Sequence, residues 1–319
     1  MNSRTLTALL MGVVLLHSGL AAAQSASNRQ TAAKAPARAA PAQPPQPAEA
    51  PLELDRFGNP VLGSPAFVVV SQKSGEVIVE QRSDAAVPIA SITKLMTAMV
   101  VLDARQNLKE VLTVTNDDID RLKGTSSRLA IGTRLTREEM LHLALMSSEN
   151  RAASALARHY PGGARAFTEA MNVKARMLGL WGTRFADSTG LDPRNVSTAR
   201  DLVNLVQAAS TYPLIREFST ADEHYVRVGN GQLRYGNSNG LVRDPEWQVS
   251  LSKTGYIREA GRCLVMQTWV RGEPVIMVLM GSEGRYTRTA DAKRVKRWLE
   301  TAGGQQRLAA VAAAARSGG

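Results

Sequence analysis

The sequence predicts an α/β protein of the α+β type, in which a largely antiparallel sheet is packed with a central helical segment. Runs rich in β-branched residues lie at both ends of the expected domain, at 67–81 and 247–281. Segments with helical periodicity occupy the middle, from 88 to 210. The most economical packing joins the terminal strands in one sheet and covers a face of that sheet with the helices.

The first 23 residues have the pattern of a secretory signal peptide. Arg4 lies in a short basic region, an apolar run follows at about Leu6–Leu16, and Ala21–Ala23 form a small-residue cleavage pattern. An uncleaved membrane anchor is the alternative. Because the apolar run is shorter than the ~20 residues that a spanning helix needs, we expect 1–23 to be cleaved, with no stable membrane anchor afterwards.

Two low-complexity segments flank the expected domain. Residues 24–54 are rich in Ala, Pro and Gln without periodicity, which is typical of a disordered linker. Residues 303–319 form a second such segment, either a loose tail or a frayed helix. Residues 55–302 remain as one domain, long enough for a sizeable core. The single cysteine, Cys263, cannot form an internal disulfide, and we expect a small buried hydrophobe in a strand.

The composition restricts the partners and cofactors. A formal net charge of +11 fits either a solvated basic face or attraction to an anionic envelope polymer, and export argues against nucleic acid. The four histidines have no metal-ligand spacing, so we expect no metal and no cofactor; they are His17, His142, His159 and His224. The glycine-rich stretch 229–240 is interpreted as a loop and not as a nucleotide site.

The N-terminal strands and the central helices each have a local signal. Val77–Gln81 follows Phe67–Ser71 across a turn at Lys73–Gly75, which predicts a hairpin. The expected helices are 88–102, 136–148, 150–163 and 197–210. The second opens with Thr136 and Glu139 spaced as a capping box. The third stops at Pro161-Gly162-Gly163, and the fourth is capped by Ser197 or Thr198.

The last third of the chain predicts strands and one helix. The expected strands are 247–256, 263–270 and 274–281. Residues 271–274 supply the turn between the last two. The closing helix starts at Thr287, places Val295 and Trp298 on one face, and has Gly303 just past its end.

The helix expected at 88–102 carries a single charge, Lys94. No other side chain between Asp84 and Asp103 is charged. Ser91 lies three residues earlier and therefore on the same helical face. Removing an ammonium group from water disfavours its charged form. A neutral lysine can take the proton of a serine hydroxyl and leave a nucleophile.

Two further short motifs carry polar residues. They are Ser148-Glu149-Asn150, at a junction between helices, and Lys253-Thr254-Gly255, at the end of a strand. Each motif alone favours an ordinary structural interpretation. Ser91 can cap a helix while Lys94 extends to solvent, the second motif can be a polar turn, and the third can be a strand edge that runs into a turn.

The ordered set of motifs is more specific than its members. Ser-x-x-Lys at 91–94, Ser-x-Asn at 148–150 and Lys-Thr-Gly at 253–255 form the signature of class A β-lactamases and penicillin-binding proteins. The sequence resembles the low-molecular-weight D-alanyl-D-alanine peptidases, in particular the endopeptidase branch called penicillin-binding protein 7. The stretches 187–202, 237–242 and 253–266 strengthen the resemblance, which covers about residues 55–300.

The resemblance implies a role for each matching residue in the first two motifs. Ser91 is the acylated nucleophile and Lys94 its general base. Ser148 relays a proton toward the leaving amine, and Asn150 holds Lys94 or the substrate amide.

The third motif is implied to bind the substrate. Lys253 adds positive charge that lowers the pKa of its neighbours and attracts the substrate carboxylate. Thr254 hydrogen-bonds that carboxylate, and Gly255 completes the motif. The backbone N–H groups of Ser91 and Tyr256 form the oxyanion hole, in which one donor is worth roughly 10²–10³ in rate.

The resemblance also implies a β-lactamase/transpeptidase-like fold and a periplasmic serine D,D-peptidase. Its substrates are peptidoglycan stem peptides, with β-lactams as covalent inhibitors. The endopeptidase branch implies hydrolysis of D-alanyl-diaminopimelate cross-links. The alternatives are a D-alanyl-D-alanine carboxypeptidase, a β-lactamase, or a non-catalytic wall-binding module.

One absence disfavours a β-lactamase. Class A enzymes use a glutamate placed after the Ser-x-Asn motif, and here no glutamate occurs between Glu169 and Glu217. Asp187 and Asp192 lie in that interval. We interpret them as loop-fixing residues, while a deacylating role for either remains open.

Overall fold

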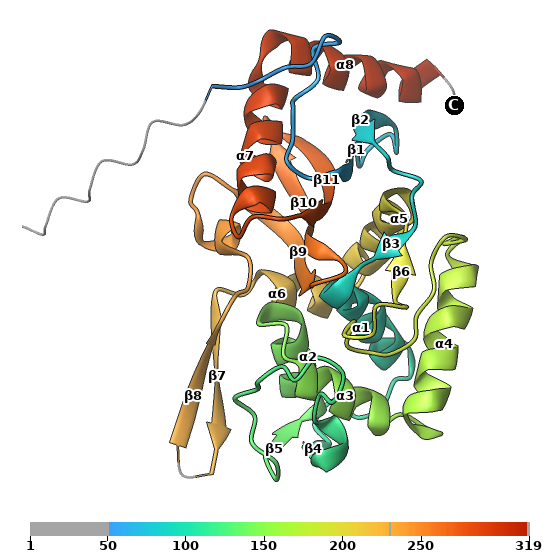
Figure 1. Cartoon of the computed structure of the whole chain (residues 1–319), viewed down its shortest axis with the longest axis vertical. Helices are drawn as coiled ribbons and strands as arrows, with labels where there is room; N and C mark the ends of the chain where they lie inside the picture. The colour runs from blue at the N-terminus through green and yellow to red at the C-terminus, as the bar shows by residue number, and fades with distance from the viewer. Residues whose placement is uncertain (1–50, 230, 318–319) are drawn as a thin grey trace, which may run out of the picture. The chain divides into compact units, whose positions relative to one another are not determined.

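A five-stranded antiparallel sheet organises the structure, a computed structural model that describes residues 51–229 and 231–317 (Figure 1). Its strands are β1 (Ala66–Ser71), β2 (Val77–Gln81), β9 (Gln248–Ile257), β10 (Gly261–Val270) and β11 (Glu273–Ser282), in the order β2-β1-β11-β10-β9. The two ends of the domain meet where β1 pairs with β11, with Val68 opposite Val278. The predicted fold class is confirmed. The expected signal peptide and residues 24–50 of the expected linker lie outside the described residues.

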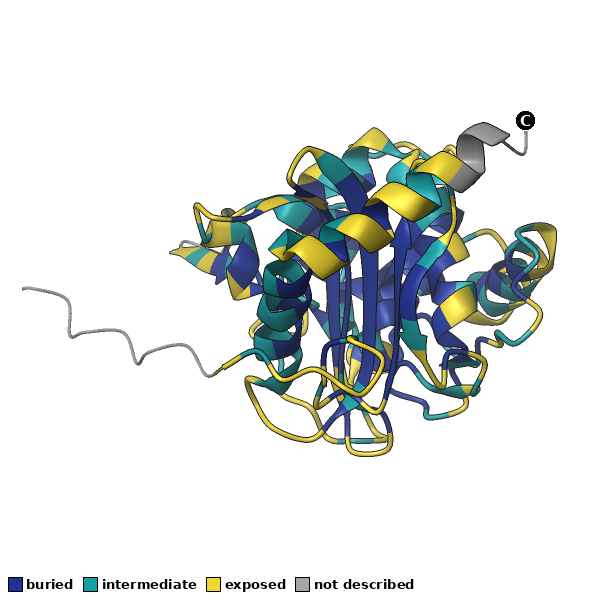
Figure 2. Cartoon of the chain, turned by 90° about the horizontal axis from the view of Figure 1, so that it is seen from above, coloured by how far each residue is buried: buried dark blue, intermediate teal, exposed yellow. Residues whose placement is uncertain are grey.

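Both faces of the sheet are covered, because alternate residues of its strands enter two different cores. Val68 and Val70 belong to the larger core, and Phe67 and Val69 belong to a second one. Successive side chains of a strand point to opposite faces, so β1, which is buried throughout, must have a layer on each side. Figure 2 shows the sheet strands as buried, with helices above them. Helices were expected on only one face of the sheet.

Eight α-helices and three 3-10 turns surround the sheet within the described residues. The helices are α1 (Lys94–Asp103), α2 (Arg137–Met146), α3 (Asn150–Arg158), α4 (Gly163–Met177), α5 (Ala199–Ser210), α6 (Pro213–Thr220), α7 (Thr287–Glu300) and α8 (Ala302–Ser317). The turns are η1 (Ala90–Thr93), η2 (Asn116–Asp118) and η3 (Gly240–Arg243). None of these helices is long and apolar enough to cross a membrane.

The helices divide between the two cores. The central ones, including α1 and α5, contribute to the larger core. Helices α7 and α8 supply Val295, Trp298 and Leu308 to the second core on the other face of the sheet. Helix α8 therefore packs on the domain through Leu308, and Gly303 lies inside this helix instead of ending the helical region.

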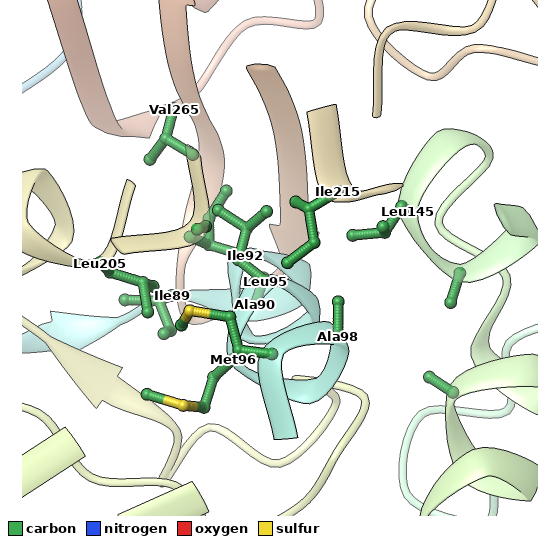
Figure 3. Packing of buried hydrophobic residues seen from close by; sticks show 14 of the residues in the cluster. Ile89, Ala90, Ile92, Leu95, Met96, Ala98, Leu145, Leu205, Ile215 and Val265 are labelled. Carbon is green, nitrogen blue, oxygen red and sulfur yellow. The ribbon is translucent and has the colours of Figure 1, made fainter. Parts of the chain in front are cut away.

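Helix α1 runs through the larger core, which explains its composition. All residues from Lys94 to Val101 are buried. Figure 3 shows residues of this region packed against side chains of neighbouring elements; they are Ile89, Ala90, Ile92, Leu95, Met96 and Ala98, with Leu145, Leu205, Ile215 and Val265 around them. A helix that is buried all round must be apolar all round, so its one lysine requires a separate explanation.

Three pairs of short strands complete the fold. They are β3 (Val87–Pro88) with β6 (Val196–Ser197), β4 (Val111–Thr113) with β5 (Arg134–Thr136), and β7 (Glu223–Val228) with β8 (Gly231–Gly236). The interpretation of 229–240 as a loop is wrong for β8. Its glycines resemble a loop, but Tyr235 is buried and pairs opposite His224, which makes the segment half of a hairpin.

Helix boundaries follow the predicted signals in part. The capping box of Thr136 and Glu139 at α2 is confirmed, and Thr198 caps α5 by accepting a hydrogen bond from the Asp201 N–H. Helices α4 and α6 were not anticipated. Gly162 was interpreted as part of a helix stop, but with φ of 84° it is also the N-cap of α4.

Candidate active site

Ser91 lies in η1, the 3-10 turn that leads into α1. Residues three apart eclipse each other in a 3-10 turn, so Lys94 stands next to Ser91. Ala90, immediately before the serine, has a φ of 47° and is fully buried. Such a conformation costs a non-glycine residue on the order of 1–3 kcal/mol and persists only where the surroundings hold it.

Two glycines allow the backbone around Ser91 to be packed closely. A Cβ at Gly190 would lie 1.9 Å from the carbonyl oxygen of Ala90. A Cβ at Gly255 would lie 3.2 Å from the amide nitrogen of Ser91. The loop that contains Gly190 and strand β9 therefore both rest against this turn and fix the position of the serine.

Lys94 places its amine at the centre of a polar cluster. The side chain is 1% exposed. Its Nζ lies 2.9 Å from Ser91 Oγ, 2.7 Å from Asn150 Oδ1 and 2.7 Å from the carbonyl oxygen of Thr189. The last two oxygens are acceptors only, so they take the two N–H groups of a neutral amine. The remaining position of the nitrogen, its lone pair, then faces the hydroxyl of Ser91.

Burial lowers the pKa of Lys94 from 10.5 to about 8, and the carboxylates of Asp187 and Glu149 oppose this shift. Lys253 is also 1% exposed, and its pKa is lowered by burial first, then by the charges of Lys94 and Arg288. Desolvation is the principal reason that Lys94 can be neutral near physiological pH.

The second motif lies at the junction that the sequence predicted, between the end of α2 and the start of α3. Ser148 has a φ of 63°, and its Oγ lies 2.9 Å from Lys253 Nζ. Asn150 is the first residue of α3, with its Oδ1 toward Lys94. Its Nδ2 donates to Thr125 Oγ1 at 3.1 Å.

The third motif lies on β9, at the edge of the sheet. The motif was expected to close a strand, but β9 continues to Ile257. Lys253 donates to Ser148 Oγ and, at 2.8 Å, to the carbonyl oxygen of Thr254. The hydroxyl of Thr254 donates to Ser238 Oγ at 2.8 Å. A free edge strand leaves backbone groups available to an extended peptide.

The peptide bond between Gly255 and Tyr256 has the features that an oxyanion donor needs. Arg288 Nη1 donates to the Gly255 carbonyl oxygen at 2.9 Å. In a trans peptide the N–H points opposite to the C=O, so the Tyr256 N–H points away from Arg288. The Tyr256 side chain is 54% exposed, and the Arg262 guanidinium lies 4.3 Å from its ring centroid. Participation of this N–H in an oxyanion hole stays a prediction.

The loop around Gly190 is held by a single carboxylate. Asp187 accepts hydrogen bonds from the N–H groups of Thr189, Gly190 and Asp192 and from Asn195 Nδ2. Asp192 in turn pairs with Arg194. These contacts support the loop-fixing interpretation of both aspartates.

Three contacts of the site were not anticipated. The Thr189 carbonyl holds Lys94, Thr125 holds Asn150, and Ser238 holds Thr254. Thr189 and Ser238 fall in stretches that carried the family resemblance, 187–202 and 237–242, but no role was assigned to them. Thr125 had no signal in the sequence.

A cavity of about 620 Å³ adjoins this cluster. Asn150 and Thr189 form part of its wall, and its charged lining residues are Arg121, Arg165 and four aspartates, Asp117, Asp118, Asp120 and Asp187. It is large enough for a peptide side chain beside Asn150 and Thr189, which both bond Lys94.

The antiparallel sheet, the helices on both of its faces and the serine beside a buried lysine define the class of penicillin-binding serine peptidases with a β-lactamase-like fold. The chain belongs to the D-alanyl-D-alanine carboxypeptidase family, peptidase family S11, whose family model matches residues 56–284. The resemblance inferred from the motifs, including that to the endopeptidase branch, is confirmed.

Individual relatives agree with this assignment. The chain is 46% identical over 283 residues to a D-alanyl-D-alanine endopeptidase of Pseudomonas aeruginosa, with 88% of each chain covered. It is 47% identical over 245 residues to that of Escherichia coli, with 76% of this chain and 79% of the relative covered. Among solved structures, the Streptomyces K15 DD-transpeptidase matches with a TM-score of 0.70 and 26% identity, over 75% of this chain and 97% of the other.

Proposed function

We propose that this chain is a periplasmic serine D,D-peptidase that hydrolyses D-alanyl bonds of peptidoglycan through an acyl-enzyme on Ser91. The preferred substrate is the D-alanyl-diaminopimelate cross-link, and β-lactams are covalent inhibitors. The distance of 2.9 Å between Lys94 Nζ and Ser91 Oγ, in a site where burial lowers the pKa of the lysine to about 8, carries the proposal. A hydroxyl needs a neighbouring base to become a nucleophile, and a neutral amine within hydrogen-bond reach supplies it.

Acylation begins with transfer of the Ser91 proton to Lys94. The serine oxygen attacks the carbonyl carbon of the D-alanyl residue, and the negative charge on the carbonyl oxygen is stabilised by the N–H groups of Ser91 and Tyr256. The C–N bond then breaks. Ser148, held by Lys253, relays the proton from Lys94 to the leaving amine, so that Lys94 returns to its neutral form, and the acyl group stays on Ser91 as an ester.

Deacylation reverses the same chemistry with water in place of the amine. Lys94 accepts a proton from the water, the resulting hydroxide attacks the ester, and Ser91 recovers its proton as the acid is released. The carboxylate of Asp187 is occupied by hydrogen bonds from its own loop, which argues against a base of the class A β-lactamase kind. The low pKa and burial of Lys94 favour catalysis over a purely wall-binding module.

The preference for cross-links is supported by the named relatives. Three endopeptidases are 38–47% identical to this chain, whereas the carboxypeptidases are 28–30% identical and the chain spans 60–62% of their length. A carboxypeptidase is the alternative, because both activities use the same acylation.

The acyl-enzyme is tested by labelling with a fluorescent penicillin, followed by peptide mapping. We expect one modified peptide, with the label on Ser91, and no label on Ser91→Ala. Attachment at another residue, or no attachment, contradicts the proposal.

The substrate is tested by digesting purified cross-linked muropeptides and weighing the products by mass spectrometry. An endopeptidase converts dimers to monomers and leaves terminal D-alanine in place. Release of free D-alanine from pentapeptides without loss of dimers identifies a carboxypeptidase instead.

A further inference from the structure

A chain of hydrogen bonds extends from Lys94 to a carboxylate outside the three motifs. Lys94 Nζ bonds Asn150 Oδ1 at 2.7 Å, and Asn150 Nδ2 donates to Thr125 Oγ1 at 3.1 Å. The Thr125 hydroxyl then donates to Asp120 Oδ2 at 2.7 Å. Asp120 and Thr125 lie in the loop between η2 and β5.

The carboxylate of Asp120 fixes the donor and the acceptor of each hydrogen bond in this series. An ionised carboxylate only accepts hydrogen bonds, and a hydroxyl has a single proton. Because that proton goes to Asp120, Thr125 can only accept from Asn150. Asn150 must therefore present its NH₂ group to Thr125 and its carbonyl oxygen to Lys94.

The direction matters at Lys94. With Oδ1 facing it, the neutral amine uses an N–H toward Asn150 and keeps its lone pair for the proton of Ser91. With the amide reversed, Asn150 Nδ2 would donate into that lone pair. The amine would then be neutral and yet unable to accept the serine proton.

The hydrogen bonds around Asp120 favour its ionised form. Burial raises its pKa, but hydrogen bonds from the Lys123 N–H and from Thr125 outweigh burial and lower the pKa. The Leu122 N–H bonds the same carboxylate. Lys123 also pairs with Glu259 at 2.5 Å, which attaches the loop to the turn after β9.

We propose that Asp120 and Thr125 are positioning residues that set the orientation of the Asn150 amide and so keep the lone pair of Lys94 directed at Ser91. The inference rests on the proposed function, since it concerns how the base of that reaction is presented. Their hydrogen bonds reach Lys94 through Asn150, so their effect on Ser91 is indirect.

The experiment compares Thr125→Val with Thr125→Ser. Valine keeps the shape but cannot accept the Asn150 N–H, whereas serine keeps the hydroxyl. Stopped-flow acylation by a fluorescent penicillin separates the binding constant from the acylation rate constant. For Thr125→Val we expect the rate constant to fall about tenfold to a hundredfold, a part of the 10²–10⁴ of a general base, with binding unchanged. Thr125→Ser should recover most of the rate, and Ser126→Ala in the same loop is the matched control.

The pH profile distinguishes a misdirected lone pair from a shifted pKa. If Thr125 only tuned the pKa of Lys94, raising the pH to 10 would restore the rate of Thr125→Val. We expect the deficit to persist at every pH. Asp120→Asn should show the same deficit. Its amide can donate to Thr125, which lets the hydrogen bonds reverse and the Asn150 amide turn over. Thermal melting checks that each variant is folded. If Asp120→Asn is unfolded, Thr125→Val alone provides the test.

Two results overturn the inference. One is a Thr125→Val rate constant within about twofold of the wild type, and the other is a Thr125→Ser variant as slow as Thr125→Val. Either leaves the proposed function intact, provided that the wild type is labelled on Ser91. If the wild type is not labelled on Ser91, the proposed function itself is contradicted. That experiment is done before any variant is made.

Discussion

Lys94 is the residue at which sequence and structure are most closely linked. A lone charge in an apolar helix is rare unless it has partners or a role. The spacing alone places Ser91 on the same helical face, and the ordered set of three motifs implies that Lys94 is its base. The structure adds its hydrogen-bond partners, of which Asn150 was anticipated and the Thr189 carbonyl was not. A backbone carbonyl has no side-chain signature, so its contribution is visible only once the loop around Gly190 is folded against α1.

Substitution of Lys94 by arginine tests whether the charge or the basicity is needed. A guanidinium keeps the charge but cannot act as a base near neutral pH. We expect Lys94→Arg to be folded by circular dichroism and to lose acylation by about 10³-fold or more. Lys109→Arg, at an exposed lysine, is the control and should be unaffected. Normal labelling of Lys94→Arg removes this lysine from the mechanism.

At the scale of helices and strands, the sequence predicts well those elements that have a strong local signal. The first hairpin, the three C-terminal strands and the capped helices α2 and α5 follow from periodicity and caps. Helix α4 was missed because Gly162 and Gly163 are helix breakers by composition, although Phe167 and Met171 lie four residues apart on one buried face. The 3-10 geometry of η1 and the contact with the Gly190 loop depend on distant segments and have no local signal.

The close packing of the Gly190 loop on η1 gives a prediction at this scale. Alanine at Gly190 would be strained by the φ of 82° and would place its Cβ 1.9 Å from the Ala90 carbonyl oxygen. We expect Gly190→Ala to displace the turn that holds Ser91, to lower the melting temperature and to slow acylation. Gly75→Ala is the matched control, since Gly75 has a φ of 73° with nothing within 4 Å of the added Cβ. Equal effects of the two substitutions would mean that φ strain alone is responsible.

At the scale of the whole molecule, the sheet separates two cores, and a stack of three rings involves none of the residues of the three motifs. His142 on α2 lies between Phe218 and His224, with ring centroids at 4.4 and 4.1 Å. Within the described residues, the Nε2 atoms of both histidines are buried without a hydrogen-bond partner. Burial and His224 lower the pKa of His142 to about 4, and Glu138 opposes the shift. No group of potential metal ligands occurs among the described residues.

This stack predicts an acid-sensitive stability. The pKa of His142 is about 4 in the folded protein and about 6.5 in the unfolded chain, so the unfolded chain binds the proton first. The free energy of unfolding should therefore fall as the pH drops from about 6.5 toward 4, by about 1–2 kcal/mol after solvent screening is allowed for. Melting temperatures at pH 7 and pH 4.5 measure the loss. It should shrink in His142→Phe and persist in His159→Gln; equal losses in both variants would exclude the stack as its source.

The central claim is that Lys94 reacts in its neutral form, whose lone pair accepts the proton of Ser91. The pH dependence of the second-order rate constant for acylation by a fluorescent penicillin tests it most directly. With a pKa of about 8, the neutral form is lost below that pH, so the rate constant should be constant above about pH 8 and fall roughly tenfold per unit below it. A rate constant that stays flat between pH 8 and pH 6 would contradict the account.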